Sequence, residues 1–458
     1  MIEPTFAAFF WGFLLLYGTL MYAVSPRART ASAFFRGTDD AGRPASQWAL
    51  TCSIFISWIF AKSVTNAANL GAAHGIVGGL AYAAYWLSIP VAGMVIYRLR
   101  TRHGASGLVS FLIDRYGRLA ALSFALAILI RLYNEVWSNT AVVGAYYGHA
   151  GEWPFIGAAL LFTAATLFYS LKGGLRSSIA TDVIQAVLFA VVLAVVLFMV
   201  LPKHGLGKLA SVGEFRLEAG LDLLLVALLQ VLSYPFHDPV LTDRGFVTEA
   251  KSMLRAMIVA GFAGFACILA FSLVGVHARL EGLPAGDNMP GAVAGAFGVL
   301  PYLLMTGIMI VAAGSTLDST FASIAKSGGQ EAPLLAGRAP GRHAVTIGLW
   351  TMVAFAVLGN LPMLAGTDIL KATTISGTMV MGLAPVFLLA PLVRRSPWSF
   401  HLSFWPGAAL GAMLATGKIP DSWAIGGGKY ALLLGTNLYG LLICTAGFLI
   451  PLLWRRHR

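Results

Sequence analysis

The sequence has 458 residues, of which 58% are hydrophobic and only 11% are charged, and its net charge is +12. A soluble domain averages about 45–50% apolar and about 25% charged residues, so this composition excludes a soluble globular protein. Long continuous apolar runs recur along the chain, and every backbone polar group inside a bilayer must be bonded internally. We therefore predict an all-α polytopic membrane protein rather than a β-barrel.

The predicted spans follow one another with short loops, so we expect residues 1–458 to form a single transmembrane domain. A span needs roughly 20 apolar residues. About thirteen runs meet this requirement: 5–24, 47–70, 74–98, 119–148, 153–171, 177–201, 219–240, 255–278, 292–325, 343–361, 366–392, 400–416 and 430–453. The first run follows Glu3 and has no basic segment before it, so we interpret it as a retained span rather than a signal peptide.

The distribution of the basic residues reflects the membrane topology and does not indicate a negatively charged partner. Most of the 31 lysines and arginines fall in alternate loops, which the positive-inside rule assigns to the cytoplasmic side. This bias predicts a multi-pass protein of the inner (plasma) membrane with its N-terminus outside and its C-terminus cytoplasmic. We expect the bilayer and a small molecule as partners and no nucleic acid; the oligomeric state stays open. The three cysteines show neither metal-binding nor disulfide spacing.

Two of the predicted spans look interrupted. Span 219–240 runs into "LSYPFHDPVLTDRGF", where Pro235 and Pro239 each remove a backbone donor. Span 47–70 contains no proline or glycine, but it carries an unusual number of polar side chains. Interrupted spans at matching positions of two halves indicate a transporter binding site.

The positions of these two spans predict an internal repeat. They are the second and seventh spans, so each opens a unit of five helices if the first span (5–24) is an extra helix. The units are then 47–201 and 219–392, followed by two extra C-terminal helices in 400–453. Because each unit has an odd number of spans, the two units lie inverted in the membrane.

Ionisable and hydroxyl groups inside the spans mark candidate sites, because such groups are costly in a bilayer. Asp182 opens the sixth span within "YSLKGGLRSSIATDVIQAVLF", where it either favours the positive end of its own helix or attracts a cation. The ninth span contains "AAGSTLDST" (312–320), whose hydroxyls either back-bond to the preceding turn or supply oxygen ligands to a hard cation.

Lys62 lies in the middle of the second span, on one face with Trp58 and Asn66. It forms a structural salt bridge, binds a substrate carboxylate or titrates as a coupling group. Arg131 and Glu135 are four residues apart, so we expect them to pair with each other.

Four further ionisable positions have roles that are open or peripheral. His237 and Asp238 either bind solute or cap the interrupted helix. Asp368 and Lys371 are expected to be a helix cap and an interfacial charge.

Four stretches together resemble the sodium/solute symporter family, which includes sodium-coupled proline, sugar and sialic acid transporters. They are "YSLKGGLRSSIATDVIQAV", "AAGSTLDST", "HDPVLTDRGF" with its Pro-x4-Arg-x-Phe spacing, and "AGRPASQW" leading into "SWIFAKS". The resemblance covers roughly residues 40–395. It implies a LeuT-like inverted repeat of five plus five helices and a sodium ion as the coupling ion.

The resemblance also implies where the sodium ion binds. Its ligands would be the hydroxyls of Ser315 and Thr316 and the carbonyl of Ala312, completed by the carbonyls of Cys52 and Phe55. Asp182 would lie on the inner path of the ion. At the unwound point this chain has Phe55-Ile56-Ser57, where the family usually has small residues.

Our hypothesis from the sequence is a sodium-coupled secondary symporter that imports a small polar organic solute by alternating access. The expected solute face comprises Ser57, Trp58, Lys62, Asn66, Tyr234, Phe236 and His237. An alternative is a proton-coupled or uncoupled transporter on the same scaffold that uses Lys62 or His237. A membrane sensor or membrane-embedded enzyme is a further alternative, but no catalytic motif supports an enzyme.

Overall fold

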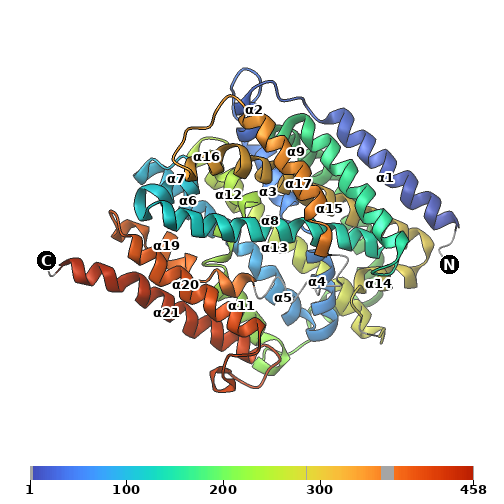
Figure 1. The fold of residues 1–458 in the computed structure, drawn as a ribbon. Coiled ribbons are helices and arrows are strands. Elements are labelled where there is room, and N and C mark those ends of the chain that lie inside the picture. The colour runs from blue at the N-terminus through green and yellow to red at the C-terminus, as the bar shows by residue number, and fades with distance from the viewer. Residues whose placement is uncertain (1–3, 285, 363–375, 457–458) are drawn as a thin grey trace.

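The structure is a computed structural model that describes residues 4–284, 286–362 and 376–456, and all regular secondary structure in these ranges is helical (Figure 1). The predicted all-α class is therefore confirmed. Seven helices of this part of the chain are long and apolar enough to cross a membrane, or eight if a bent pair counts as one span. The count of thirteen spans and the boundaries of the two five-helix units stay predictions. Asp368 and Lys371 lie outside the described residues.

The first half of the chain supplies the long helices of the bundle together with one broken pair. Its elements are α1 (Pro4–Val24), α2 (Ala31–Arg36), α3 (Gln47–Ser57), α4 (Ala61–His74), α5 (Ile76–Ala83), η1 (Ala84–Leu87), α6 (Ser88–His103), α7 (Leu108–Tyr116), α8 (Arg118–Ala145), α9 (Trp153–His204) and α10 (Leu206–Ala210).

The second half begins with short, interrupted pieces and ends in two long apolar helices that pack on each other, α20 and α21. Its elements are η2 (Leu217–Ala219), α11 (Leu221–Gln230), η3 (Tyr234–His237), α12 (Pro239–Thr242), η4 (Asp243–Phe246), α13 (Ala250–Leu280), α14 (Met289–Phe297), α15 (Val299–Lys326), a π-helical turn (Ser327–Glu331), α16 (Ala332–Leu335), α17 (Ala344–Leu358), α19 (Leu383–Leu388), η7 (Ala390–Leu392), α20 (Pro397–Ala415), η8 (Asp421–Trp423) and α21 (Ala431–Arg456).

α9 contains two of the predicted spans, because it folds back on itself at Gly174. This residue has φ 54° and ψ −132°, which are not helical angles. The neighbours of α9 on α1 show the reversal. A Cβ on Gly18 would meet Ala165 and Tyr22 stacks on Phe168, whereas the later residue Gln185 bonds back to Tyr17. The Lys172-Gly173-Gly174 stretch thus forms the turn between the predicted spans 153–171 and 177–201.

The surface of the bundle fits a bilayer. Large apolar side chains are exposed on several outer helices, for example Phe198 at 79% and Trp350 at 70%, whereas charged residues such as Arg131, Glu135 and Arg244 are buried. This is the reverse of the pattern in a soluble protein and identifies a multi-pass membrane protein.

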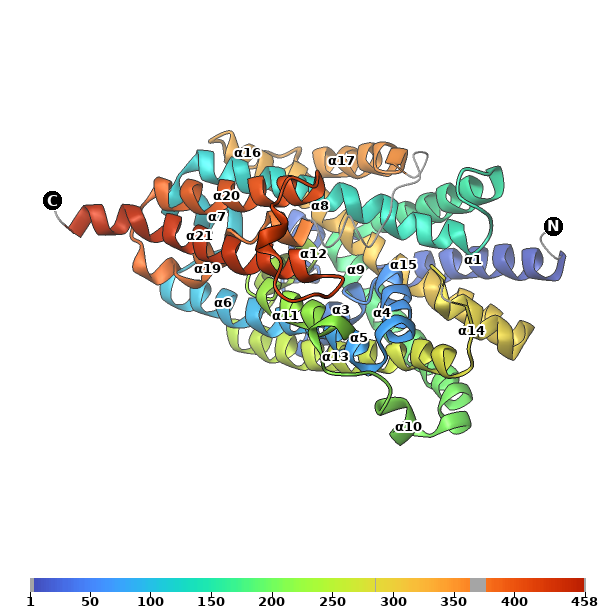
Figure 2. The same cartoon turned by 90° about the horizontal axis from the view of Figure 1, so that it is seen from below.

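The two termini lie at opposite ends of the bundle in both views (Figures 1 and 2). α7 and α16, which belong to loops with many basic residues, lie toward the end that carries the C-terminus. α10 and α14 lie toward the end that carries the N-terminus (Figure 2). In the middle, α15 packs extensively on α9, and α13 on α4. The candidate site lies among these helices.

Candidate functional site

The first interruption separates α3 from α4. α3 ends at Ser57, α4 begins at Ala61, and the two axes differ by 58°. The predicted break is thus confirmed, about three residues later than the Phe55–Ser57 stretch. No proline causes it; the amide of Ile59 bonds to the carbonyl of Ile56, and Phe60 turns to an extended conformation. The last carbonyls of a helix lack intrahelical partners, so this break presents oxygen atoms to the bundle interior.

The second interruption separates α11 from α12, as predicted; it contains Pro235, and Pro239 is the first residue of α12. Asp238 caps the restarted helix by accepting the amide hydrogen of Val240 at 3.1 Å, and it also pairs with Arg131 at 2.8 Å. The sequence analysis considered two roles for Asp238, helix capping and solute binding. In the structure Asp238 is a helix cap and an ion-pair partner.

The expected ion ligands of α15 meet the first interruption. The hydroxyl of Thr316 lies 3.3 Å from the carbonyl oxygen of Ser57 and 3.2 Å from that of Ala312. All three residues are fully buried. The Ser57 carbonyl is an oxygen that the sequence did not assign to the ion. Such a cluster of neutral oxygens suits a hard cation.

The two other carbonyls expected to bind the ion differ from each other. Cys52 lies inside the regular part of α3, whereas Phe55 lies in its last turn. The Ile59 amide, which in a continuing helix would bond to the Phe55 carbonyl, bonds to Ile56 instead. The Phe55 carbonyl is therefore better placed to accept a cation than the Cys52 carbonyl. Both assignments stay predictions.

Asp182 lies in a second buried polar cluster. Its carboxylate accepts hydrogen bonds from Ser53 at 2.6 Å and from Ser315, and it forms an ion pair with Arg244 at 2.9 Å. Ser315 and Asp182, both predicted for the ion path, are thus in direct contact. A hydroxyl that donates its proton to a carboxylate keeps its lone pairs for a cation.

Arg244 is a residue of this cluster that the sequence analysis did not assign to the candidate site. Its guanidinium donates to Ser53 from Nε, to the carbonyl of Val240 from Nη1, and to Asp182 and Ser319 from Nη2. The Pro-x4-Arg-x-Phe spacing marked this arginine, but no sequence signal connected it with Asp182.

A further carboxylate, Asp318, lies beside this cluster. It accepts from Tyr169, Thr181 and Ser178. Asp318 and Asp182 carry two carboxylates against the one guanidinium of Arg244, which leaves an excess of acidic groups near the ion path.

An aromatic box lies next to the two interruptions. We define it as Trp58, Tyr82, Tyr85, Trp86 and Tyr234, which line one cavity. Neighbouring rings contact each other around a closed circuit, with centroids 5.8–6.2 Å apart. The cavity measures about 30 Å³, which accommodates little more than water, so the box is closed in this conformation.

The polar groups of the aromatic box are unevenly satisfied. Tyr85 donates to Gln230 at 2.8 Å, and Tyr82 donates to Ser63. The indole N–H groups of Trp58 and Trp86 have no hydrogen-bond partner among the residues that the structure describes. A buried donor without a partner costs free energy. The Nε1 edge of Trp86 lies against α13, because a Cβ on Gly264 would be 2.8 Å from this atom. The N–H of Trp58 is therefore the candidate donor of the box.

Lys62 lines the same cavity, but its ammonium is already paired. It lies 2.6 Å from a carboxylate oxygen of Glu135 and 3.0 Å from the hydroxyl of Ser138. Glu135 also pairs with Arg131, as expected, and Arg131 pairs with Asp238. Two cations and two carboxylates thus form one buried, neutral ion network. Of the three roles that the sequence analysis considered for Lys62, this geometry matches the structural salt bridge.

The remaining residues of the expected solute face lie at different places. Ser57 donates to the carbonyl of Ser53, and Asn66 donates to the Tyr82 hydroxyl behind the box. Phe236 packs on Phe387, with ring centroids 4.6 Å apart. His237 bonds through Nδ1 to the Tyr234 carbonyl and lines a separate cavity of about 200 Å³ beside α8 and α20. Trp58, Lys62 and Tyr234 are the predicted residues that line the box cavity.

Residues 40–219 match the family model of the Sodium:solute symporter family. The chain is 26% identical over 152 residues to Sodium/glucose cotransporter 4 of Danio rerio and to that of Homo sapiens; this stretch is 32% of the chain. The match spans only 22% of the length of those two relatives.

Solved structures show the same fold over nearly the whole chain. A Na+-coupled sialic acid symporter in a substrate-bound outward-open state has a TM-score of 0.73 at 16% identity and covers 98% of this chain and 97% of that one. The nucleobase-cation-symport-1 transporter Mhp1, closed with bromovinylhydantoin bound, has a TM-score of 0.55 at 14% identity, covering 92% and 95%. The fold is thus the LeuT-like fold that the sequence predicted. In sequence over residues 40–219 and in fold over most of its length, the chain is similar to the sodium:solute symporters, as its motifs indicated.

Proposed function

We propose that this protein is a sodium-coupled symporter that imports a small organic solute by alternating access. The observation that carries the proposal is the meeting of the Thr316 hydroxyl with the carbonyls of Ser57 and Ala312 at the break between α3 and α4. These oxygens belong to two helices far apart in the sequence. A sodium ion bound among them joins α15 to the broken span and links ion binding to the conformation of the break.

Asp182 supports an inner path for the ion. It lies next to the proposed sodium site. Ser315 contacts Asp182, and the following residue, Thr316, contacts the Ser57 carbonyl at the break. The carboxylates of Asp182 and Asp318 attract a cation electrostatically. Arg244 neutralises part of this charge and so sets how strongly the ion is held.

The aromatic box supports a definite kind of solute. Its rings offer flat apolar surface, and the Trp58 N–H, which has no partner among the described residues, is the candidate donor. A polyhydroxylated solute needs a partner for each buried hydroxyl, and the box supplies few. We therefore propose a small solute with an apolar or ring-shaped face and a carbonyl or carboxylate that accepts from Trp58. Lys62 does not select this group, since Glu135 holds its ammonium.

The orientation of the protein is also proposed from charge. Loops rich in lysine and arginine gather at the end of the bundle that carries α7, α16 and the C-terminus (Figure 2). The positive-inside rule places that end in the cytoplasm of a cell whose inner membrane holds the protein.

A thermal-shift screen of the purified protein tests coupling without a known solute. Candidate amino acids, heterocycles and sugars are added in NaCl or in KCl at equal ionic strength, because a ligand that binds the folded state raises the thermal midpoint. We expect a solute that raises the midpoint in sodium only. Trp58→Phe should weaken that shift, since it keeps the ring and removes the N–H, whereas Trp153→Phe at the 82% exposed Trp153 should not. A shift of equal size in potassium, or a shift that depends on pH alone, contradicts sodium coupling.

A further inference from the structure

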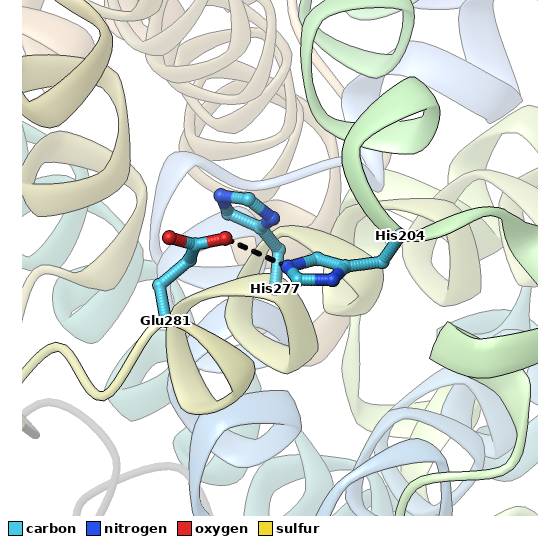
Figure 3. Close-up of side chains that lie close together, drawn as sticks. All are labelled: His204, His277 and Glu281. Atoms are coloured by element: carbon cyan, nitrogen blue, oxygen red, sulfur yellow. Dashed lines mark hydrogen bonds and ion pairs between the residues drawn. The ribbon is translucent and has the colours of Figure 1, made fainter.

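Two histidines and a glutamate converge where α9 and α13 end, away from the proposed ion and solute sites. His204 is the last residue of α9, His277 lies in the last turn of α13, and Glu281 follows α13 directly. Figure 3 shows the three side chains turned toward one another. Their potential ligand atoms all lie within 4.8 Å of one another.

The contacts within this cluster leave one histidine unsatisfied. The Nε2 atom of His204 bonds to Glu281 at 2.8 Å, and the rings of His204 and His277 are 5.2 Å apart. His277 is only 2% exposed, and its Nδ1 atom has no hydrogen-bond partner among the residues that the structure describes. A buried imidazole nitrogen without a partner is unfavourable, so the cluster lacks the group that this nitrogen would bind.

From this geometry we propose that His204, His277 and Glu281 form a binding site for a divalent transition-metal ion, with zinc as the best fit. Two imidazole nitrogens and one carboxylate oxygen are typical zinc ligands, and three protein ligands leave a fourth position for water. Side-chain rotations have to bring ligand atoms that lie within 4.8 Å of one another to about 2.0–2.2 Å from one ion, as zinc requires. The site is independent of the proposed transport function.

The surroundings of the site decide its accessibility and its strength. The side chains of His204 and Glu281 are 14% and 36% exposed, so an ion reaches them from solvent. His277 stacks on Phe297, and the ammonium of Lys203 lies 4.7 Å from the centre of the same ring. This nearby positive charge weakens the binding of a cation.

A bound metal ion would clamp two helices that belong to different predicted five-helix units. The second arm of α9 closes the first unit, and α13 lies in the second. The clamp lies at the end of the bundle that carries α10 and α14 (Figure 2), which our proposed orientation places outside the cell. Metal binding therefore raises the thermal midpoint by holding these ends together.

Isothermal titration of the metal-free protein, purified without a histidine tag, tests the site. We expect ZnCl2 to bind with one ion per chain and to raise the thermal midpoint, and MgCl2 at equal ionic strength to do neither. His277→Phe keeps the packing on Phe297, and Glu281→Gln keeps the shape of an exposed side chain. Each should lower zinc affinity about 10- to 100-fold or more. Lys203→Met should raise the affinity.

The control is His149→Ala, which removes an exposed histidine outside the cluster and should leave zinc affinity unchanged. Retained zinc binding in both His277→Phe and Glu281→Gln would overturn the proposal, as would an equal loss in His149→Ala. The absence of any stoichiometric zinc binding in the wild type would also overturn it.

Discussion

Several of the charges buried in this bundle are paired with opposite charges nearby. Lys62, Arg131, Glu135 and Asp238 form one network with no net charge, and Asp182 is paired with Arg244. Burying a charged group away from water costs roughly several kcal/mol unless oppositely charged partners and hydrogen bonds compensate for the lost hydration. The effect of a substitution here therefore depends on which charges it leaves behind.

The Lys62–Glu135 pair gives a prediction at this scale. Glu135→Gln leaves two buried cations with one carboxylate, so we expect a destabilisation of about 3–5 kcal/mol. Lys62→Met costs less, because Glu135 keeps Arg131 as its partner. The double variant leaves the neutral Arg131–Asp238 pair and should be more stable than the sum of the single effects, by about 0.5–3 kcal/mol.

Thermal midpoints of the wild type, both single variants and the double variant measure this coupling. Strictly additive midpoints would show that the two residues act independently. A Lys62→Met variant with an unchanged midpoint and lost solute binding would instead assign Lys62 to a solute carboxylate.

Individual residues of the site were predictable from the sequence to different degrees. Ser315, Thr316 and Asp182 stood out because polar groups in an apolar span are rare and expensive. Arg244 belongs to the Pro-x4-Arg-x-Phe motif, but its contact with Asp182 joins residues that are 62 positions apart in the sequence. Such a contact depends on how α9, η4 and α3 pack, which a single sequence does not encode locally. The same holds for the aromatic box.

At the scale of elements, the two interrupted spans illustrate two different signals. Prolines 235 and 239 predicted the second break directly, because proline removes a backbone donor. The first break has no such residue and was predicted only from its polar content and its matching position. The family resemblance placed this break at Phe55–Ser57, and the structure has it about three residues later, at Trp58–Phe60.

The reversal within α9 gives a prediction for an element. Gly174 has a positive φ of 54°, and a Cβ there would lie 2.5 Å from the carbonyl oxygen of Phe34. Gly174→Ala adds backbone strain of about 1–3 kcal/mol and a clash with backbone that cannot move freely. We expect a lower thermal midpoint and a smaller yield of monodisperse protein.

Gly157→Ala is the matched control on the same element, because a Cβ at Gly157 meets nothing within 4 Å. It should fold like the wild type, since alanine favours a helix over glycine. If the two variants have the same midpoint, the reversal at Gly174 does not depend on glycine.

At the scale of the whole molecule, composition and periodicity predicted a multi-pass helical bundle, and the interrupted spans predicted its internal repeat. The chain's sequence is similar to the sodium:solute symporters over residues 40–219, and its fold is that of such transporters over nearly its full length. The central proposal is that a sodium ion binds where α15 meets the break between α3 and α4. According to this proposal, sodium binding at the Thr316 hydroxyl joins α15 to α3 and thereby couples the ion to the transport cycle.

Binding of radioactive sodium to the purified protein tests this proposal most directly, with Thr316→Ala as the variant and Thr306→Ala as its control. Thr306 is equally buried on α15, but among the described residues its hydroxyl bonds only to the carbonyl of Tyr302, at 2.9 Å. We predict saturable sodium binding that potassium does not displace, about tenfold or more weaker in Thr316→Ala and unchanged in Thr306→Ala. No saturable binding in the wild type, or equal affinity in all three proteins, would contradict the account.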